Sequence, residues 1–396
     1  MMGRTPRGST RHHGCVPDER GEDIDPGHLA RWQEVGLYDP LVHTDGRRLE
    51  LITYLVALGC DEDEMVEAQR EGRLFALGGD RITRPGRNRL HLDEVADGMG
   101  VPRAMMRAVW DALAMRGDPD RGPVVSTAEA ATLAVLPLAR LLTDDDSILA
   151  LCRSIARAAA LAAEAGSSVG RRDGQTTLAL TGDELTTAQA YTEMAMAIPS
   201  LGQMLDMAFR HAVETARVQF EMSASEDLVA DGMARMGVAF VDLSGFTAAA
   251  ATMTPAELAA LTSAFEQSAE RVAREHHARV VKFIGDAALV AAPTPQLAFE
   301  VAAALVLRWR AGEVVPGMTV RAGLAAGPVS SREGDIFGTP VNLAARLVAI
   351  APVAPLVVPS ELELAIGGGW LRSAPEAVGL RGFAQPVDVV TLTPVA

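Results

Sequence analysis

The sequence has 396 residues, of which 48% are hydrophobic, and its formal net charge at pH 7 is −15. This length exceeds one ordinary domain, so two domains are expected, each with enough apolar residues for a buried core. The acidic balance disfavours nonspecific binding to nucleic acid or to anionic lipid.

The cysteines and the hydropathy pattern bear on the compartment. Cys15, Cys60 and Cys152 are widely spaced and form no C-x-x-C pair, which is typical of a reducing compartment and argues against a structural zinc site. Residues 133–142 come nearest to a membrane span, but a proline and an arginine interrupt them. We therefore expect a cytoplasmic protein without a transmembrane segment, and the sequence leaves a peripheral association with membranes open.

The N-terminal half predicts a tail and then a helical domain. Residues 1–25 are polar and rich in Arg, Gly and His, which is typical of a disordered tail and not of a signal peptide; a cloning leader or a wrong start would look the same. Residues 26–225 predict an all-helical domain that ends in a linker helix. Apolar residues recur there at helical spacing in the segments 47–59, 61–72, 104–115, 127–142 and 147–166.

The last helical segment, about 182–224, contains Pro199, which is expected to end or kink a helix. A helix that continues toward Met222 would lead directly into the second domain. Residues 223–232 have the composition of a linker.

Residues 91–110 have a helix-turn-helix pattern, with a glycine turn between a short helix and a second helix. This pattern supports an alternative function, a DNA-binding or sensory regulator with a catalytically silent second domain. The second helix offers only Arg103 and Arg107 to read bases, and the domain is acidic, whereas DNA binding usually leaves a basic footprint. The segment is more typical of a packed helical corner.

Residues 226–396 alternate between strand and helix patterns. In chain order the sequence predicts a strand at 238–242, a helix from Thr254, a hairpin of 279–284 with 287–292, a helix from Thr294, a strand at 318–326, a helix at 339–350, and strands at 355–360 and 387–392. The order β-α-β-β-α-β is that of a ferredoxin-like α+β sandwich.

Two carboxylates stand at strand ends in this domain. Asp242 follows an apolar strand and Asp286 lies in the hairpin turn; each alone would be an ordinary turn or capping residue. Side by side they would repel each other unless a cation lay between them, and hard oxygen ligands suit Mg²⁺ or Mn²⁺. The Ser-Gly pair after Leu243 could offer backbone N–H groups to phosphates, with Gly245 allowing close approach.

Lys282 is the single lysine of the chain, while the other 35 basic residues are arginine. A composition that replaces lysine with arginine elsewhere suggests that position 282 needs a compact ammonium group. Asn342 and Arg346 are four residues apart and so share one helical face, where they could orient a ribose and neutralise charge at a phosphorus. On spacing alone they could also be an ordinary solvated surface, and Asp335 could be a turn residue.

Together, "FVDLSGFT", "KFIGDA" and "GDIFGTPVNLAAR" closely resemble the catalytic motifs of class III nucleotidyl cyclases, over about residues 236–394. The resemblance implies that Asp242, Asp286 and the backbone carbonyl of Leu243 hold two metal ions, Mg²⁺ or Mn²⁺. It implies that Lys282 and Asp335 read the adenine edge, that Asn342 orients the ribose, and that Arg346 stabilises the transition state. It also implies substrate contacts from Ser244, Gly245, Phe246, Thr247 and, in "GLRGF", Arg381.

The resemblance implies the reaction as well. The ribose 3′-OH attacks the α-phosphorus of ATP in line, pyrophosphate leaves, and the product is cyclic AMP. Guanylyl enzymes of the family typically carry Glu and Cys at the positions of Lys282 and Asp335, so this pair favours ATP. Family sites form across a dimer interface, which implies a homodimer with two equivalent sites. Ile336 replaces a frequent aromatic residue and could tune activity.

The helical half resembles the regulatory domains of soluble actinobacterial cyclases, which inhibit in some members and respond to pH or small ligands. His211, in "RHAVETA" of the linker helix, is placed where a change of charge could bias packing. An ordinary exposed helical histidine is the competing interpretation.

Overall fold

The structure is a computed structural model, and its chain forms two compact units, Met1–Met204 and Leu205–Ala396. We call them the helical unit and the sheet unit. The division falls inside the long helix α11 (Glu184–Ser223). The structure describes residues 26–83, 89–172, 183–223, 233–315, 317–351 and 355–395. The predicted tail, nearly all of the predicted linker and the predicted domain boundary after residue 225 lie outside these ranges, so they stay predictions.

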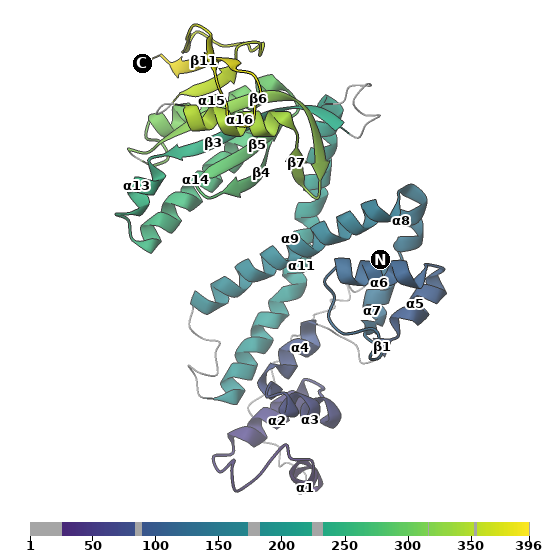
Figure 1. The fold of residues 1–396 in the computed structure, drawn as a ribbon. Helices are drawn as coiled ribbons and strands as arrows, with labels where there is room; N and C mark the ends of the chain where they lie inside the picture. Colours follow the sequence, from purple (N-terminus) through teal and green to yellow (C-terminus); the bar gives the residue numbers. More distant parts are fainter. Residues whose placement is uncertain are drawn as a thin grey trace, which may run out of the picture. The chain divides into compact units, whose positions relative to one another are not determined.

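The helical unit is built from short helices followed by two long ones (Figure 1). They are α1 (Pro26–Glu34), α2 (Arg47–Ala57), α3 (Glu62–Arg70), the 3₁₀ turn η1 (Leu74–Ala76), α4 (Leu77–Thr83), α5 (Leu92–Met99), α6 (Arg103–Ala112), α7 (Thr127–Leu133), α8 (Leu136–Leu142), α9 (Asp145–Arg172) and α11. The unit is a helical region, as predicted, and it also contains one short strand pair that was not predicted, β1 (Arg89–Leu90) with β2 (Val125–Ser126).

Two separate cores hold this unit together. The first collects α2, α3 and the start of α11, with Ile52, Met65 and Ala188 fully buried. The second packs α5 and α6 against α9, around Trp110. The buried guanidinium of Arg48 donates a hydrogen bond to the Leu37 carbonyl and forms an ion pair with Glu184 of α11.

Two helical segments that contain a proline differ from the predicted helices. The continuous helical pattern of 127–142 forms two helices, α7 and α8, and Pro137 lies in the first turn of α8, where its missing N–H costs no hydrogen bond. Helix α11 does not end at Pro199 but continues through it.

The sheet unit contains β3 (Met233–Ser244), α13 (Phe246–Ala250), α14 (Pro255–Glu275), β4 (Arg279–Ile284), β5 (Ala287–Ala292), α15 (Pro295–Arg310), β6 (Thr319–Arg332), β7 (Asp335–Phe337), α16 (Thr339–Ile350), β8 (Leu356–Pro359), β9 (Trp370–Arg372), β10 (Glu376–Val378) and β11 (Val387–Pro394). The central strand order is β6-β3-β5-β4, with every neighbouring pair antiparallel. This is the predicted ferredoxin-like arrangement. Strands β8, β11 and β10 extend the sheet beyond β6, with β8 parallel to β6.

Alternation along β3 separates two apolar layers. Ala239, Val241 and Leu243 point into a core with residues of α14 and α15. Val238 and Phe240 point to the other face, into a cluster with residues of α16. Asp242 belongs to the second set by this alternation, so its side chain lies on the α16 face of the sheet.

Helix α16 packs very closely on strand β6. A Cβ built on Gly323 would lie 2.2 Å from the Val348 backbone nitrogen and 2.5 Å from the Ala344 carbonyl oxygen. Glycine is therefore required there for the close approach of helix and strand.

Candidate functional site

The two carboxylates Asp242 and Asp286 are neighbours in the structure. Asp242 pairs with Ala287 at the start of β5. The Leu243 backbone N–H donates to the Asp286 backbone carbonyl at 3.1 Å. Gly285, with φ of 62°, makes the tight turn that brings Asp286 to the end of β3. The register of β3 against β5 therefore brings Asp242 and Asp286 close together, as the sequence predicts.

Arg321 joins this pair and was not singled out from the sequence. It lies opposite Asp242 in the β3–β6 register. Its Nε and Nη2 lie 2.8 Å and 2.7 Å from the same carboxylate oxygen, Asp242 Oδ2. No motif marks Arg321 as functional; only the strand register reveals it.

The environment of Asp242 favours a nearby cation. Burial raises the pKa of the Asp242 carboxyl, the hydrogen bonds and charge of Arg321 lower it in part, and the charge of Asp286 raises it further. The Ser244 hydroxyl oxygen, two residues away, is buried without a hydrogen-bond partner among the described residues. Two adjacent carboxylates and an unsatisfied oxygen fit Mg²⁺ or Mn²⁺. No group of three or more His, Cys, Asp or Glu side chains within the described ranges could hold a metal ion, so such ions would need further oxygens, such as the Leu243 carbonyl and substrate phosphates.

The loop after β3 turns sharply into the short helix α13. Gly245 has φ of 80° and is the N-cap residue of α13, which begins at Phe246. A Cβ there would meet no atom within 4 Å, so glycine is needed at this position for its left-handed backbone and not for lack of space. Thr247 is exposed in the same turn.

Lys282 and Asp335 form an ion pair, with Lys282 Nζ 2.5 Å from Asp335 Oδ2. A β-bulge between Val280 and Lys282 shifts the register of β4, so Lys282 stands opposite Leu289, which packs on the α16 face. Asp335 opens β7, which pairs back on the end of β6. The bulge therefore turns the lysine to the same face as Asp242.

The charge of Asp335 is stabilised in this pair. Burial alone would raise the pKa of Asp335, but the hydrogen bonds from Lys282 and from the Ile336 backbone N–H, with the charges of Lys282 and Arg279, hold it below its usual value. Arg279 also donates to the neighbouring Gly334 carbonyl at 3.2 Å. The hairpin tip is thus fixed against β4.

Asn342 and Arg346 lie on the exposed side of α16. No hydrogen bond or ion pair joins their side chains to other parts of the chain that the structure describes. The two are on one helical face, as their spacing predicts.

In one chain Asn342 does not meet Asp242. Pro340, at the start of α16, lies over Gly327, whereas Asp242 pairs with Arg321. Gly327 and Arg321 are six residues apart on β6, which corresponds to about 20 Å along the strand. Asn342, which is near the start of α16, therefore lies far from Asp242 along the sheet.

The remaining predicted residues are placed as follows. Arg381 is exposed in the segment between β10 and β11. His211 is exposed on α11, and its carbonyl accepts a hydrogen bond from Thr215. Ile336 is buried in the cluster beneath α16.

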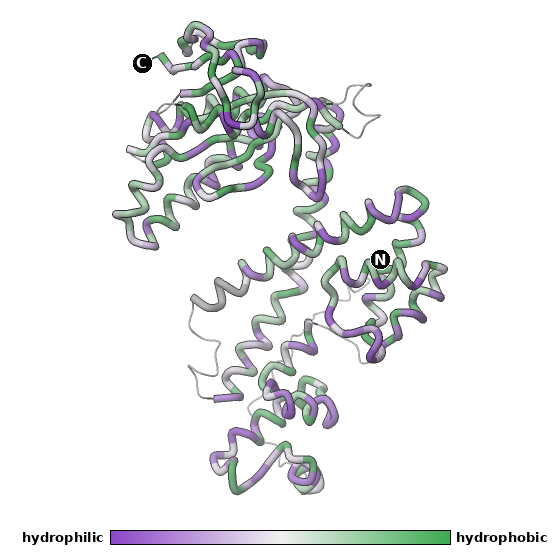
Figure 2. The backbone as a smooth tube through the Cα atoms, in the orientation of Figure 1, coloured by the Kyte–Doolittle hydropathy of each residue, from purple (hydrophilic) through white to green (hydrophobic). Residues whose placement is uncertain are grey.

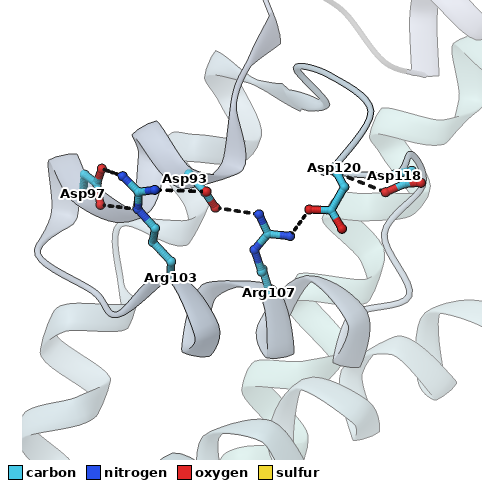
Figure 3. Close-up of polar contacts among 6 residues, drawn as sticks. All are labelled: Asp93, Asp97, Arg103, Arg107, Asp118 and Asp120. Carbon is cyan, nitrogen blue, oxygen red and sulfur yellow. Dashed lines mark hydrogen bonds and ion pairs between the residues drawn. The ribbon is translucent and has the colours of Figure 1, made fainter.

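The helix-turn-helix pattern forms α5 and α6, but its arginines are paired with carboxylates (Figure 3). Arg103 donates to Asp97 and Asp93, and Arg107 contacts Asp93 and Asp120. A DNA phosphate would have to displace these acidic partners. The structure therefore favours a packed corner over a DNA-reading element.

Among the described residues, no helix combines the length and the hydropathy needed to cross a membrane.

Comparisons with known proteins identify a catalytic domain within the sheet unit. The family model described as "Adenylate and Guanylate cyclase catalytic domain" matches residues 228–364. Asp242, Asp286, Lys282, Asp335 and the Asn342–Arg346 pair fall inside the match; Arg381 falls outside it.

Relatives cover both units. An uncharacterized protein of Mycobacterium tuberculosis (strain ATCC 25618 / H37Rv) is 36% identical over 344 residues, 86% of this chain and 89% of that protein. A protein of M. tuberculosis (strain CDC 1551 / Oshkosh) named as a pH-sensitive adenylate cyclase is 29% identical, over 86% of this chain and 84% of that one. An adenylate cyclase of Streptomyces coelicolor is 34% identical over 166 residues, 42% of each chain.

Among solved structures, the adenylyl cyclase CyaB from P. aeruginosa is similar with a TM-score of 0.34 and 17% identity, over 41% of this chain and 96% of that one. The chain belongs to the class III cyclase family, and its sheet unit carries the family's catalytic domain.

Proposed function

We propose that this protein is an adenylate cyclase that converts ATP to 3′,5′-cyclic AMP and pyrophosphate. The observation that carries the proposal is the Lys282–Asp335 ion pair within a class III catalytic domain. This pair offers a donor and an acceptor side by side, which suits the N1 and the amino group of adenine. Two relatives that are named adenylate cyclases support the same substrate.

Asp242 and Asp286 are the proposed metal ligands, with the Leu243 carbonyl. Two bound Mg²⁺ or Mn²⁺ ions would activate the ribose 3′-OH and neutralise charge at the α-phosphate. The 3′ oxygen forms its bond to the α-phosphorus and loses its proton, while the bond from that phosphorus to the bridging oxygen breaks. Backbone N–H groups of the loop from Ser244 to Thr247 are proposed to hold the phosphates.

The other residues act on the ribose and on the developing charge. Asn342 is proposed to orient the ribose, and Arg346 to stabilise the transition state, because both side chains are exposed and leave their donors available. Arg381 and Arg321 are proposed to bind the triphosphate. For this, Arg321 would leave its ion pair with Asp242 and donate hydrogen bonds to phosphate oxygens instead.

We propose a homodimer in which each site combines residues of two copies. The separation of about 20 Å along β6 between Asp242 and Pro340, at the start of α16, supports this arrangement for Asn342, which lies two residues after Pro340.

The helical unit is proposed to regulate the sheet unit, and to inhibit it. The likeness over 86% of the chain to a protein named as a pH-sensitive adenylate cyclase supports regulation by pH. His211 is the candidate regulatory residue because it lies on α11, the helix that runs from one unit into the other. The cysteine pattern supports a cytoplasmic location.

The test is product formation by the full chain with Mn²⁺ and either ATP or GTP. We expect cyclic AMP from ATP and little product from GTP. Asp286→Ala should lower the rate by at least about a hundredfold because a metal ligand is lost. Asp388→Ala, an exposed carboxylate on β11, is the matched control and should remain active. A folded full chain that makes no cyclic AMP would overturn the proposal and favour the silent sensory alternative.

A further inference from the structure

Asp335 lies on a short hairpin that β7 forms with the end of β6 (Figure 1). Three residue pairs join the two strands, and the turn between them consists of Glu333 and Gly334. Both turn residues have positive φ, 52° and 84°, as the tightest hairpin turns require. A two-stranded hairpin of this length is only marginally stable by itself, so further contacts must fix the position of Asp335.

Apolar packing supports this hairpin at one residue of β7. Ile336 is 2% exposed and lies in the cluster beneath α16, whereas Arg332 and Gly334 at the tip are exposed. The tip, which lies below the β7 label in Figure 1, is purple and therefore hydrophilic in Figure 2. Apolar contacts thus hold the residue after Asp335, and the tip depends on polar contacts.

Two cations of β4 lie on the same face of the sheet because of the β-bulge. Arg279 lies opposite Ala291. Lys282 lies opposite Leu289, and both of these partners pack on the α16 face. Residues three positions apart on a regular strand point to opposite faces, and the extra residue of the bulge removes this difference. Both cations can therefore reach the hairpin, since β7 contacts β4.

The two cations hold different parts of the hairpin. Lys282 forms its ion pair with Oδ2 of Asp335, whose Oδ1 accepts a hydrogen bond from the Ile336 backbone N–H at 2.8 Å. Arg279 Nη1 instead donates to the carbonyl oxygen of Gly334, the residue before Asp335, at 3.2 Å. Burial lowers the pKa of the Arg279 guanidinium, and the charge of Asp335 opposes this shift. Arg279 is half-buried whereas Lys282 is exposed, so water screens the Arg279 contacts less.

Only one of these two contacts is independent of the substrate. In the proposed function, Lys282 donates to the adenine ring and Asp335 accepts from its amino group, so a bound base shares both groups of their ion pair. The hydrogen bond from Arg279 to the Gly334 carbonyl uses neither group. It can therefore hold the hairpin both before and after the base binds.

We infer that Arg279 is a positioning residue for base recognition, which holds the Gly334 carbonyl and so keeps Asp335 where it can read the adenine amino group. The inference rests on the proposed function. It adds a residue that lies outside the motif "KFIGDA" and that need not touch the nucleotide.

Steady-state kinetics of the full chain with Mn²⁺ and either ATP or GTP test this role. Arg279→Met keeps an apolar stem of similar length and removes the donor and the charge. We expect KM for ATP to rise at least about fivefold while kcat stays within about twofold, because a fixed base contributes equally to substrate and transition-state binding. KM for GTP should change little, so the preference for ATP should fall.

Two further variants separate the role of the donor from general effects. Arg279→Lys keeps a donor and a charge and should recover part of the loss in KM. Arg274→Met is the matched control, because Arg274 is exposed on α14, on the other side of the sheet; it should behave as the unmodified chain does. Arg279→Gln replaces Arg279→Met if that variant does not fold, with the same expected changes.

Two measurements need no turnover. Arg279→Met should weaken binding of 3′-deoxy-ATP, which lacks the attacking hydroxyl, at least about fivefold, and should change binding of 3′-deoxy-GTP little. Amide hydrogen exchange should become faster in β7 and stay unchanged in β3 and β5, because only the hairpin loses a contact.

The outcomes separate this inference from the proposed function. Unchanged exchange in β7, an unchanged KM for ATP, or KM values for ATP and GTP that rise by the same factor would overturn the role of Arg279. If the unmodified chain then makes cyclic AMP, the cyclase proposal stands without it. Faster exchange in β7 and selectively weaker 3′-deoxy-ATP binding, in a chain that makes no cyclic AMP, would support the positioning role while the proposed reaction fails.

Discussion

At the scale of single residues, the Lys282–Asp335 pair is the proposed determinant of the choice between ATP and GTP. Lys282 and Asp335 contact each other directly, and guanylyl members of the family that the sequence resembles typically carry Glu and Cys there. We expect Lys282→Glu with Asp335→Cys to lower kcat/KM for ATP at least about tenfold and to raise it for GTP, because the donor and acceptor positions exchange. The measurement is kcat/KM for both nucleotides.

The control for this prediction is Lys282→Ala, which removes the donor without providing an acceptor. It should lose activity with ATP and gain none with GTP. A double variant that stays selective for ATP would show that other residues choose the base.

The same ion pair predicts a pH dependence of stability. The pKa of Asp335 is lowered in the folded chain, so its charge stabilises the fold above its unfolded pKa, and this contribution is lost as the pH falls through the folded pKa. Asp335→Asn should therefore be less stable than the unmodified chain at pH 7, by at most about 1 kcal/mol since Lys282 is largely exposed. In thermal unfolding the difference should shrink as the pH falls below the usual pKa of an aspartate and through the lowered pKa of Asp335. A difference that does not change with pH would contradict this prediction.

Sequence motifs were sufficient to find Asp242, Asp286, Lys282 and Asp335 as candidates, because each stands beside a strong turn or strand signal. They could not find Arg321, since its role depends on the register of β6 against β3. They also could not find the bulge that turns Lys282 to the α16 face, because a bulge leaves no clear pattern in the strand.

At the scale of elements, the packing of α16 on β6 depends on one missing side chain. Gly323→Ala would place a methyl group 2.2 Å from the Val348 nitrogen. The backbone must shift, so we expect a loss of about 2 kcal/mol or more in the free energy of unfolding. Gly367→Ala has no neighbour within 4 Å and should be nearly neutral. Chemical denaturation of both variants makes the comparison, and equal stability would contradict the packing argument.

Helix α11 carries His211, the residue proposed to make the activity depend on pH. If His211 is the regulatory residue, His211→Ala should flatten the dependence of activity on pH between 5 and 8, the range in which histidine changes charge. Gln203→Ala, an exposed substitution on the same helix without a titrating group, should leave the profile unchanged. The measurement is the initial rate across pH, and identical profiles for all three proteins would contradict a role for His211.

Elements with strong end signals were predictable. The boundaries of α16 agree with the predicted 339–350, and Thr254 caps α14 in the predicted capping box. The short strands β7, β9 and β10 were missed because three residues are too few for an alternating pattern. Local rules predict an end or a kink at Pro199, and of these two outcomes the end does not occur, because helix α11 continues through this residue.

At the scale of the whole molecule, the central claim is that each catalytic site combines two chains. Asp242 and the start of α16 lie about 20 Å apart along the sheet of one chain. A chain with Asp242→Ala and a chain with Asn342→Ala, a residue near that start of α16, should each be inactive as homodimers. A heterodimer of the two would keep one site free of both substitutions.

The most direct measurement is cyclic AMP production from ATP by that heterodimer, isolated through a different tag on each chain. We predict about half of the activity of the unmodified dimer, because one of two equivalent sites is intact. The two parent homodimers should give almost none. A heterodimer as inactive as its parents, beside an active unmodified dimer, would contradict a site shared between two copies.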